Sequence, residues 1–420
     1  MSADSGRRPV HAALLAFGLL VHVLFQVLPA KTAVWDTGNG RDFASYYYAY
    51  KVADHGGDPY DNAQLDRMAS SEHTRPTVQP YFYPPPFLAT MAWVPAFKLP
   101  IAYRGMLVLN ELALASCLVV LWAGFSVPMG AIGVLLAIWS PIPDNLKMGQ
   151  ANLLALLPAL LGLWTARIDR RWAPWVGGVL LGTAAMFKMS PALFLLYWAM
   201  RREWKPVLAA IGTAVGLSLA SLVLVPLTTQ IEFYTVVLPG FARGDYHGLS
   251  IPISLSANHS IPDIFNTWWP GPSKTALSGK ALLASRIVTV VLLTWWFARS
   301  AVLVRSTVAS EPVGVARALG ALTILMVTLP TYTYEHHLVF LLLPVATLIA
   351  LVFERAPAAF ASGASTPSRV WVFSSVIAIF FVAWPLDVLN ATMHAVPTAL
   401  APLVRESKFM GLIAMFFLLL

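Results

Sequence analysis

Residues 35–60 read WDTGNGRDFASYYYAYKVADHGGDPY, and they form the first long polar interval after the first apolar run of the chain. The interval closes in Gly56-Gly57-Asp58-Pro59-Tyr60, a combination typical of turns. It contains the carboxylates Asp36, Asp42, Asp54 and Asp58. A carboxylate-rich loop held beside a membrane suggests chemistry on a polar substrate that is carried by a lipid. We therefore expect the reactive group of the protein in this stretch.

The composition decides the class of protein. Of the 420 residues, 58% are hydrophobic and only 11% are charged, whereas about 25% of the residues of a soluble domain are charged. The apolar runs are continuous and do not alternate, which favours membrane-spanning helices over a barrel. We predict an all-α polytopic membrane protein with about 11 to 13 transmembrane helices. The whole chain, 1–420, is expected to form a single integral membrane domain.

The charges predict the topology. The net charge is +8, and its basic residues stand in short clusters beside apolar spans, which indicates membrane orientation and no nucleic-acid partner. Arg7 and Arg8 precede a first span near 10–28, which we expect to be retained as an anchor. The only cysteine is Cys117, so no intramolecular disulfide can form.

The remaining basic clusters are assigned to the inner side. They are Lys98 with Arg104, and the groups within 167–171, 201–205 and 299–317. A span near 83–97 is expected to return the chain to the inner side. Between Arg104 and Arg167 the number of crossings must then be even, yet three apolar runs lie there, near 105–124, 127–143 and 151–167. We expect 127–143 to be a re-entrant or broken helix, because it is short and contains three prolines.

Two large external segments result, at 29–80 and 228–280. In the first, Asp42 to Asp54 is expected to form an amphipathic helix on the membrane surface. Asp42 would be its N-cap, and Gly56-Gly57 would end it.

The candidate site residues all fall on the outer face in this topology. Asp58 is our first candidate for a general base, and its alternative is a simple turn residue. Asp42 can be a helix cap or a substrate contact. Lys188, between two apolar segments, either snorkels or binds a lipid-linked phosphate. The further candidates for substrate binding are Tyr46, Tyr60, Asn258, His259, Glu335, His336 and His337.

Alternatives remain open for several of these residues. Tyrosines such as Tyr46 are enriched at membrane interfaces, and stacking on sugar rings is the other interpretation. His336 and His337 can bind phosphate or sugar. Adjacent histidines do not share a helical face, so we expect no metal there. The chain also lacks a Walker motif and a Gly-x-Gly-x-x-Gly motif. A lipid-carried sugar donor therefore fits better than a nucleotide sugar, and no cofactor is expected.

An ordered set of motifs resembles a known family. The set comprises Asp42-Phe43 with Tyr46-Tyr47, Gly56 to Tyr60, Tyr83-Pro84-Pro85-Pro86-Phe87, Gly149-Gln150-Ala151-Asn152, Lys188-Met189-Ser190-Pro191 and Glu335-His336-His337. It is similar to polytopic glycosyltransferases of the GT-C superfamily. Within them it resembles the actinobacterial polyprenol-phosphate-mannose-dependent mannosyltransferases, over about residues 35–340.

The resemblance implies an inverting, α-1,2-forming mannosyltransferase at the outer face of the plasma membrane. The donor would be polyprenyl-phosphate mannose. The acceptor would be a phosphatidylinositol mannoside that carries four or five mannoses. By motif, Asp58 would be the catalytic aspartate, and Lys188 with His336 or His337 would contact the donor.

The sequence is also compatible with two other functions. Many spans, broken helices and intramembrane charges also suit a transporter or flippase for a lipid-linked sugar. Polar residues on one face and the lack of an evident inverted repeat favour the enzyme. A related mannosyltransferase that branches lipomannan or lipoarabinomannan is the other alternative.

Overall fold

The computed structural model describes the chain except residues 1–6, 29–39, 74–77, 244–251, 306–311 and 361–364. Its described parts are helical and contain no β-strand, which confirms the predicted all-α fold class. Among the described residues, six helices are long and apolar enough to cross a membrane. A bent helix pair could form a seventh span, and five shorter apolar helices accompany them. The protein is therefore a multi-pass membrane protein, and the count of 11 to 13 spans stays a prediction.

The helices of the first half follow the apolar runs of the sequence. They are α1 (Arg7–His22), η1 (Val23–Val27), α3 (Arg41–Asp54), α4 (Asn62–Ser71), α5 (Pro85–Ala89), η3 (Val94–Ala96), α6 (Leu99–Phe125), α7 (Met129–Ile138), α8 (Pro141–Met148), α9 (Asn152–Thr165), α10 (Ala173–Phe187), η4 (Ser190–Phe194) and α11 (Leu195–Met200).

The second half contains two of the longest helices and several short ones. Its helices are α12 (Trp204–Ala220), η5 (Ser221–Val223), α13 (Leu227–Glu232), η6 (Phe233–Val237), α14 (Leu238–Arg243), α15 (Ile261–Trp268), α16 (Gly279–Arg305), α17 (Pro312–Thr328), η8 (Glu335–Leu341), α18 (Leu342–Ala359), α19 (Thr366–Ala383), α20 (Leu386–Ala395), α21 (Ala401–Arg405) and α22 (Ser407–Leu419).

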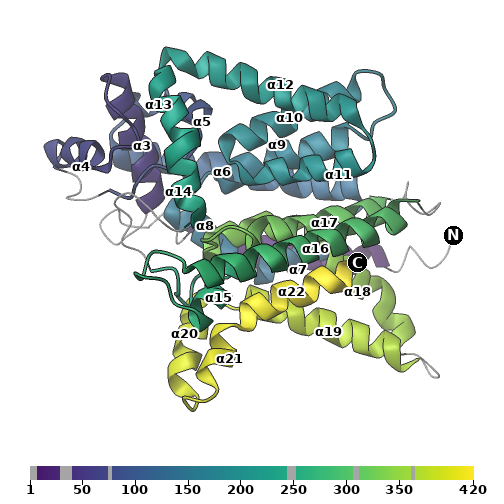
Figure 1. Ribbon diagram of the computed structural model, residues 1–420. Helices are drawn as coiled ribbons and strands as arrows, with labels where there is room; N and C mark the ends of the chain where they lie inside the picture. Colours follow the sequence, from purple (N-terminus) through teal and green to yellow (C-terminus); the bar gives the residue numbers. More distant parts are fainter. Residues whose placement is uncertain (1–6, 29–39, 74–77, 244–251, 306–311, 361–364) are drawn as a thin grey trace.

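The long helices run roughly side by side, and the short ones gather at one end of the bundle. Figure 1 shows α3, α4, α14, α15, α20 and α21 at its left, away from the N-terminus. We call this the site end, because the candidate residues of α3, η8 and the segment after α10 lie there. The predicted second external segment, 228–280, contains α14 and α15 and so belongs to the same end.

The bent pair α7–α8 runs along the bundle in the same direction as α1. Gly130 lies against His11 and Gly133 against Leu14, near the start of both helices. Further along, Gln26 Nε2 donates to the Leu136 carbonyl at 3.1 Å. After a 61° bend, α8 continues toward the site end. The predicted break at the prolines is confirmed, and the bent pair fits either a broken span or a re-entrant loop.

The predicted span near 83–97 is also wrong. The segment contains only the short helices α5 and η3, separated by turns, because four of its residues are proline and proline interrupts helices. The start of α6 then lies at the site end, where the Tyr103 hydroxyl donates to the Leu146 carbonyl at 3.0 Å. Lys98 and Arg104 thus lie near the site end, together with the candidate residues that the charge pattern had assigned to the opposite side. Two basic residues are too few for a statistical charge bias to be decisive.

Helix α3 has the predicted bounds but not the predicted exposure. Ten of its residues are buried, and they continue around the helix from Phe43 to Ala53. The helix is therefore enclosed by protein and is not an amphipathic helix on a surface. Gly40, with φ of 65°, is its N-cap in place of Asp42. His55 follows its last turn, and Gly56, with φ of 77°, turns the chain away.

Candidate active site

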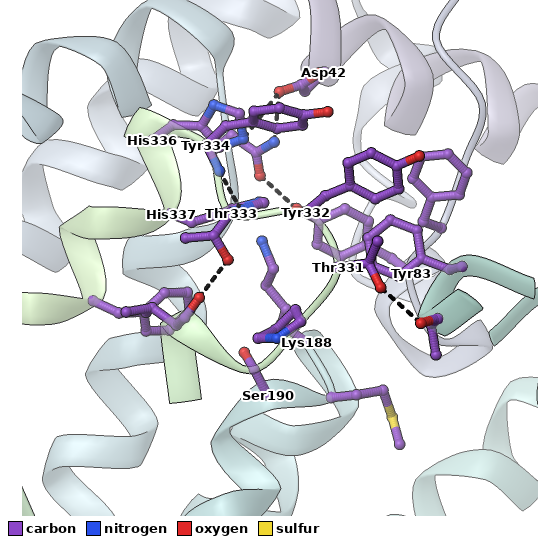
Figure 2. A pocket seen from close by; sticks show the side chains of 18 of the residues that line it. Asp42, Tyr83, Lys188, Ser190, Thr331, Tyr332, Thr333, Tyr334, His336 and His337 are labelled. Atoms are coloured by element: carbon purple, nitrogen blue, oxygen red, sulfur yellow. Dashed lines mark hydrogen bonds and ion pairs between the residues drawn. The ribbon is translucent and has the colours of Figure 1, made fainter. Parts of the chain in front are cut away.

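A cavity of about 510 Å³ opens at the site end between α3, η4, α14 and η8. Its polar lining residues include Asp42, Tyr46, Gln150, Lys188, His336 and His337. Its apolar lining residues include Leu193, Leu238, Phe241, Met326 and Leu329. Figure 2 shows Lys188 projecting toward the middle of the cavity, with Asp42 at its upper edge. A cavity lined by both charged and apolar side chains suits a ligand with a polar head and a hydrocarbon tail.

Asp42 is the carboxylate of this cavity. It occupies the first turn of α3, where the helix dipole favours a negative charge. Its Oδ2 accepts from Gln150 Nε2 at 2.5 Å and lies 3.9 Å from His336 Nε2. Burial raises the pKa of Asp42, while the hydrogen bond from Gln150 and the nearby ammonium of Lys188 oppose that rise. A carboxylate whose pKa is raised is a better proton acceptor when ionised.

Gln150 is held in one orientation by two tyrosines. Its Oε1 accepts from Tyr83 at 2.5 Å and from Tyr46 at 3.0 Å. Because an ionised carboxylate can only accept, the amide nitrogen faces Asp42 and the amide oxygen faces the two hydroxyls. Burial raises the pKa values of Tyr46 and Tyr83, so both stay neutral donors.

Lys188 lies at the end of α10, where the helix gives way to an extended residue. Its Nζ donates to Asn152 Oδ1 at 2.6 Å and lies 5.5 Å from the centre of the Tyr83 ring. Burial lowers the pKa of Lys188 to about 7, although Asp42 opposes the shift. Helices α10 and η4 meet at Lys188, and Lys188 lies among the residues that line the cavity.

His336 and His337 both line the cavity from the first turn of η8. Their ring centres lie 4.4 Å apart and the rings are nearly perpendicular. His337 Nδ1 accepts from the Tyr334 backbone N–H at 3.2 Å. No group of three or more potential metal ligands occurs in the described parts of the chain.

Asp58, the first candidate from the sequence, is not among the residues that line the cavity. Its Oδ1 accepts from the Tyr60 N–H at 2.9 Å, as the turn interpretation expects. Burial raises the pKa of Asp58, and the hydrogen bond from Tyr60 opposes the rise. Tyr60 also lies outside the lining and donates its hydroxyl to the Tyr83 carbonyl at 2.9 Å. Asp36 lies outside the described residues.

Three further candidates support the cavity from behind instead of lining it. Asn258 Nδ2 donates to the Thr331 carbonyl at 2.9 Å, and its Oδ1 accepts from the Thr333 N–H at 2.8 Å. His259 Nε2 lies 2.8 Å from Glu335 Oε1. The other oxygen of Glu335 accepts from Lys408 Nζ at 2.6 Å. These residues therefore fix the backbone that leads into His336.

Sequence reasoning quoted Gln150, Asn152 and Tyr83 within motifs but assigned them no role. The signal was present, because Gln150 and Asn152 follow a proline-rich break and flank the start of an apolar helix. Lys408 was missed entirely, since nothing in its neighbourhood matched a motif. The available signal was a lysine at the start of an apolar run, next to Ser407 and before Phe409.

Comparison with known proteins identifies the family. Residues 81–330 match glycosyltransferase family 87. The chain is 29% identical over 216 residues to the polyprenol-phosphate-mannose-dependent alpha-(1-2)-phosphatidylinositol mannoside mannosyltransferase of Mycolicibacterium smegmatis. It is 32% identical over 88 residues to the protein of that name from Mycobacterium tuberculosis.

These alignments are partial. The first covers 51% of this chain and 45% of the relative, and the second covers 21% and 19%. No solved structure matches the chain. The family match nevertheless extends over more than half of the chain and includes Tyr83, Gln150 and Lys188 of the cavity. The expected resemblance to mannosyltransferases is confirmed, and this chain belongs to glycosyltransferase family 87.

Proposed function

We propose that the protein transfers mannose from polyprenyl-phosphate mannose to a hydroxyl of a phosphatidylinositol mannoside. The product would carry an α-1,2 linkage, and the acceptor would have four or five mannoses. The reaction would take place at the outer face of the plasma membrane. The names of the two mycobacterial relatives support the donor and the acceptor.

One observation carries the proposal: the same cavity is lined by the carboxylate Asp42, the cation Lys188 and several apolar side chains. The ammonium of Lys188 would bind the phosphate of the donor, since a compact cation suits a phosphate. The prenyl chain would follow the apolar side, along Leu238 and Phe241. The acceptor hydroxyl would approach Asp42 from the other side.

We further propose Asp42, and not Asp58, as the general base. The hydroxyl oxygen of the acceptor forms a bond to the anomeric carbon, and its proton moves to Asp42. The bond between that carbon and the phosphate oxygen breaks, and its electron pair leaves with polyprenyl phosphate. An inverting displacement of this kind gives an α product from a β-linked donor. A phosphate leaving group needs little acid assistance, so one base is sufficient.

The test measures transfer of labelled mannose by purified wild-type protein, Asp42→Asn and Asp58→Asn. Size-exclusion profile and thermal unfolding establish that the variants fold equally. We expect Asp42→Asn to lose roughly 10²–10⁴-fold in rate, the usual cost of removing a general base. Asp58→Asn should retain most activity, because its amide oxygen still accepts from the Tyr60 N–H.

The opposite pattern, with loss in Asp58→Asn and activity in Asp42→Asn, would assign the base to Asp58. Linkage analysis of the product by α-mannosidase digestion and NMR tests the α-1,2 assignment. No transfer by folded wild-type protein to any phosphatidylinositol mannoside would overturn the enzyme proposal. Movement of the labelled donor across vesicles would then support transport.

A further inference from the structure

Three buried asparagines form a line from the interior of α6 to the cavity. Asn110 lies on α6, Asn145 on α8 and Asn152 at the start of α9, and all three are fully buried. Asn110 Nδ2 donates to the Met106 carbonyl at 3.0 Å. Asn145 Nδ2 donates to Asn110 Oδ1 at 3.0 Å, and Asn152 Nδ2 donates to Asn145 Oδ1 at 3.1 Å. The line ends at Lys188, which donates to Asn152 Oδ1 at 2.6 Å.

The direction of every bond in the line is fixed. A lysine ammonium can only donate, so the oxygen of Asn152 must face Lys188. The amide nitrogen of Asn152 then faces Asn145, and the same reasoning turns the nitrogen of Asn145 toward Asn110. At the far end, the Met106 carbonyl can only accept. Both ends therefore demand the same orientation, and such a chain of hydrogen bonds strengthens cooperatively.

Asn152 also joins two parts of the cavity wall. The second proton of its amide is donated to the His336 carbonyl at 2.8 Å. One side chain thus holds Lys188, which follows α10, and His336, which begins η8. These residues are separated by 148 positions in the sequence, and no covalent constraint relates them.

We propose that Asn152, held by Asn145 and Asn110, is a positioning residue that sets the Lys188 ammonium against the His336 segment for binding of a phosphate group. The inference rests on the proposed function, because it assigns the phosphate of the donor lipid to Lys188. Within the described residues, one N–H of Lys188 is used by Asn152, and two remain for a ligand.

Fully buried amides carry a cost that packing alone does not require. An amide moved from water into an apolar interior is unfavourable unless all of its hydrogen bonds are made. Replacing such groups by apolar side chains of similar size can be nearly neutral for stability. Apolar side chains could fill the same space between α6, α8 and α9. Three asparagines in a continuous line that ends at Lys188 therefore indicate a role beyond packing.

The first experiment measures the pH dependence of the reactivity of the Lys188 amine and needs no substrate. Purified protein is labelled with acetic anhydride across a pH series, and mass spectrometry follows modification of Lys188. The groups that face this amine are Asp42, His336, His337 and Tyr83, and all are kept unchanged. The test variant is Asn145→Leu, which alters neither a lining residue nor a direct partner of Lys188.

We expect the labelling midpoint of Lys188 to move to lower pH in Asn145→Leu. Loss of the bond from Asn145 lets Asn152 turn away, and a hydrogen bond that stabilised the charged amine is weakened. The matched control is Gln230→Leu, which removes a buried amide that is bonded to Ser218, Ser221 and Val225 far from the line. Its midpoint should equal that of wild type.

The second measurement compares KM for the donor with KM for the acceptor. Asn145→Leu should raise KM for polyprenyl-phosphate mannose by about tenfold, the equivalent of one hydrogen bond to a charged group. KM for the acceptor should change by less than about twofold. If Asn145→Leu does not fold, the double variant Asn110→Leu/Asn145→Leu replaces it, since it leaves no unpaired amide between α6 and α8.

Failure of this inference differs from failure of the proposed function. An unchanged labelling midpoint in the folded variants, or an equal shift in Gln230→Leu, would overturn the positioning role even if mannose transfer is robust. A shifted midpoint in a protein that transfers no mannose would keep the positioning of Lys188 and reject the proposed donor.

Discussion

Gln150 Nε2 lies 2.5 Å from Asp42 Oδ2, and the hydroxyls of Tyr46 and Tyr83 keep the amide turned this way. This contact links the first polar segment of the chain to the start of α9. Burial favours the neutral form of Asp42, whereas the amide N–H favours the ionised form. The proposed base must be ionised to accept a proton, so Gln150 extends its activity toward lower pH.

Gln150→Leu should therefore shift the acidic limb of the rate profile to higher pH. The hydrogen bond lowers the pKa of Asp42, so its removal raises that pKa, and activity is lost at a pH where wild type still works. The measurement is kcat/KM for transfer between pH 4 and pH 9. Gln230→Leu, which removes a buried amide outside the cavity, is the control. An acidic limb at the wild-type position would exclude this role of Gln150.

Lys188→Arg should remove the alkaline limb of the same profile. Burial lowers the pKa of Lys188 to about 7, so the ammonium is present below that pH and is lost as the pH rises through it. Donor binding that depends on the cation weakens accordingly, and KM for the donor should increase above about pH 7. Arginine stays charged throughout this range.

The absolute rate of Lys188→Arg is expected to fall, because a planar guanidinium does not match the site of a compact ammonium. Lys188→Met is the companion variant and should show a high donor KM at every pH. If Lys188→Arg keeps the wild-type alkaline limb, another group is responsible for it.

Asp58→Ala tests the turn that Asp58 stabilises. The carboxylate accepts from the Tyr60 N–H, and loss of one such bond typically costs about 1 kcal/mol of stability. We expect a modest decrease in thermal stability and no change in the pH profile, since Asp58 does not line the cavity. Asp58→Asn should be as stable as wild type. A changed pH profile in a stable Asp58→Ala protein would contradict this assignment.

Sequence reasoning found the site end, the helix that begins near Asp42 and the break after α7. It did so because hydropathy, prolines and clustered charges are local signals. It ranked Asp58 before Asp42 as the candidate base, whereas Asp42 and not Asp58 lines the cavity. The choice depends on how α3 is rotated, and the packing of Phe43 and Tyr47 around that helix determines its rotation.

The contacts between distant segments were also beyond the sequence. Asn152 meets the His336 carbonyl across 184 positions, and Lys408 meets Glu335 across 73. No periodicity relates such pairs. Charge counting likewise assigned Lys98 and Arg104 to the inner side, because it assumed that 83–97 was a continuous helix. The prolines in that segment were the evidence against it.

Lys408 is a fully buried cation near the start of α22. Its Nζ lies 2.6 Å from Glu335 Oε2, while His259 contacts the other carboxylate oxygen. Lys408→Met leaves Glu335 with an uncompensated charge, which typically costs about 3–5 kcal/mol. The measurement is thermal unfolding of the purified protein. Lys51→Met, which opens the partly exposed pair with Glu72, is the control and should cost less than about 1 kcal/mol.

A second substitution distinguishes the ion pair from general packing. Lys408→Met/Glu335→Gln removes both charges and keeps an amide that can bond His259, so most of the lost stability should return. The two effects should be strongly non-additive, as expected for residues in direct contact. A double variant less stable than Lys408→Met would show that Lys408 acts through packing of its side chain. Because Glu335 precedes His336, recovered stability should be accompanied by recovered transfer, which connects α22 to the cavity.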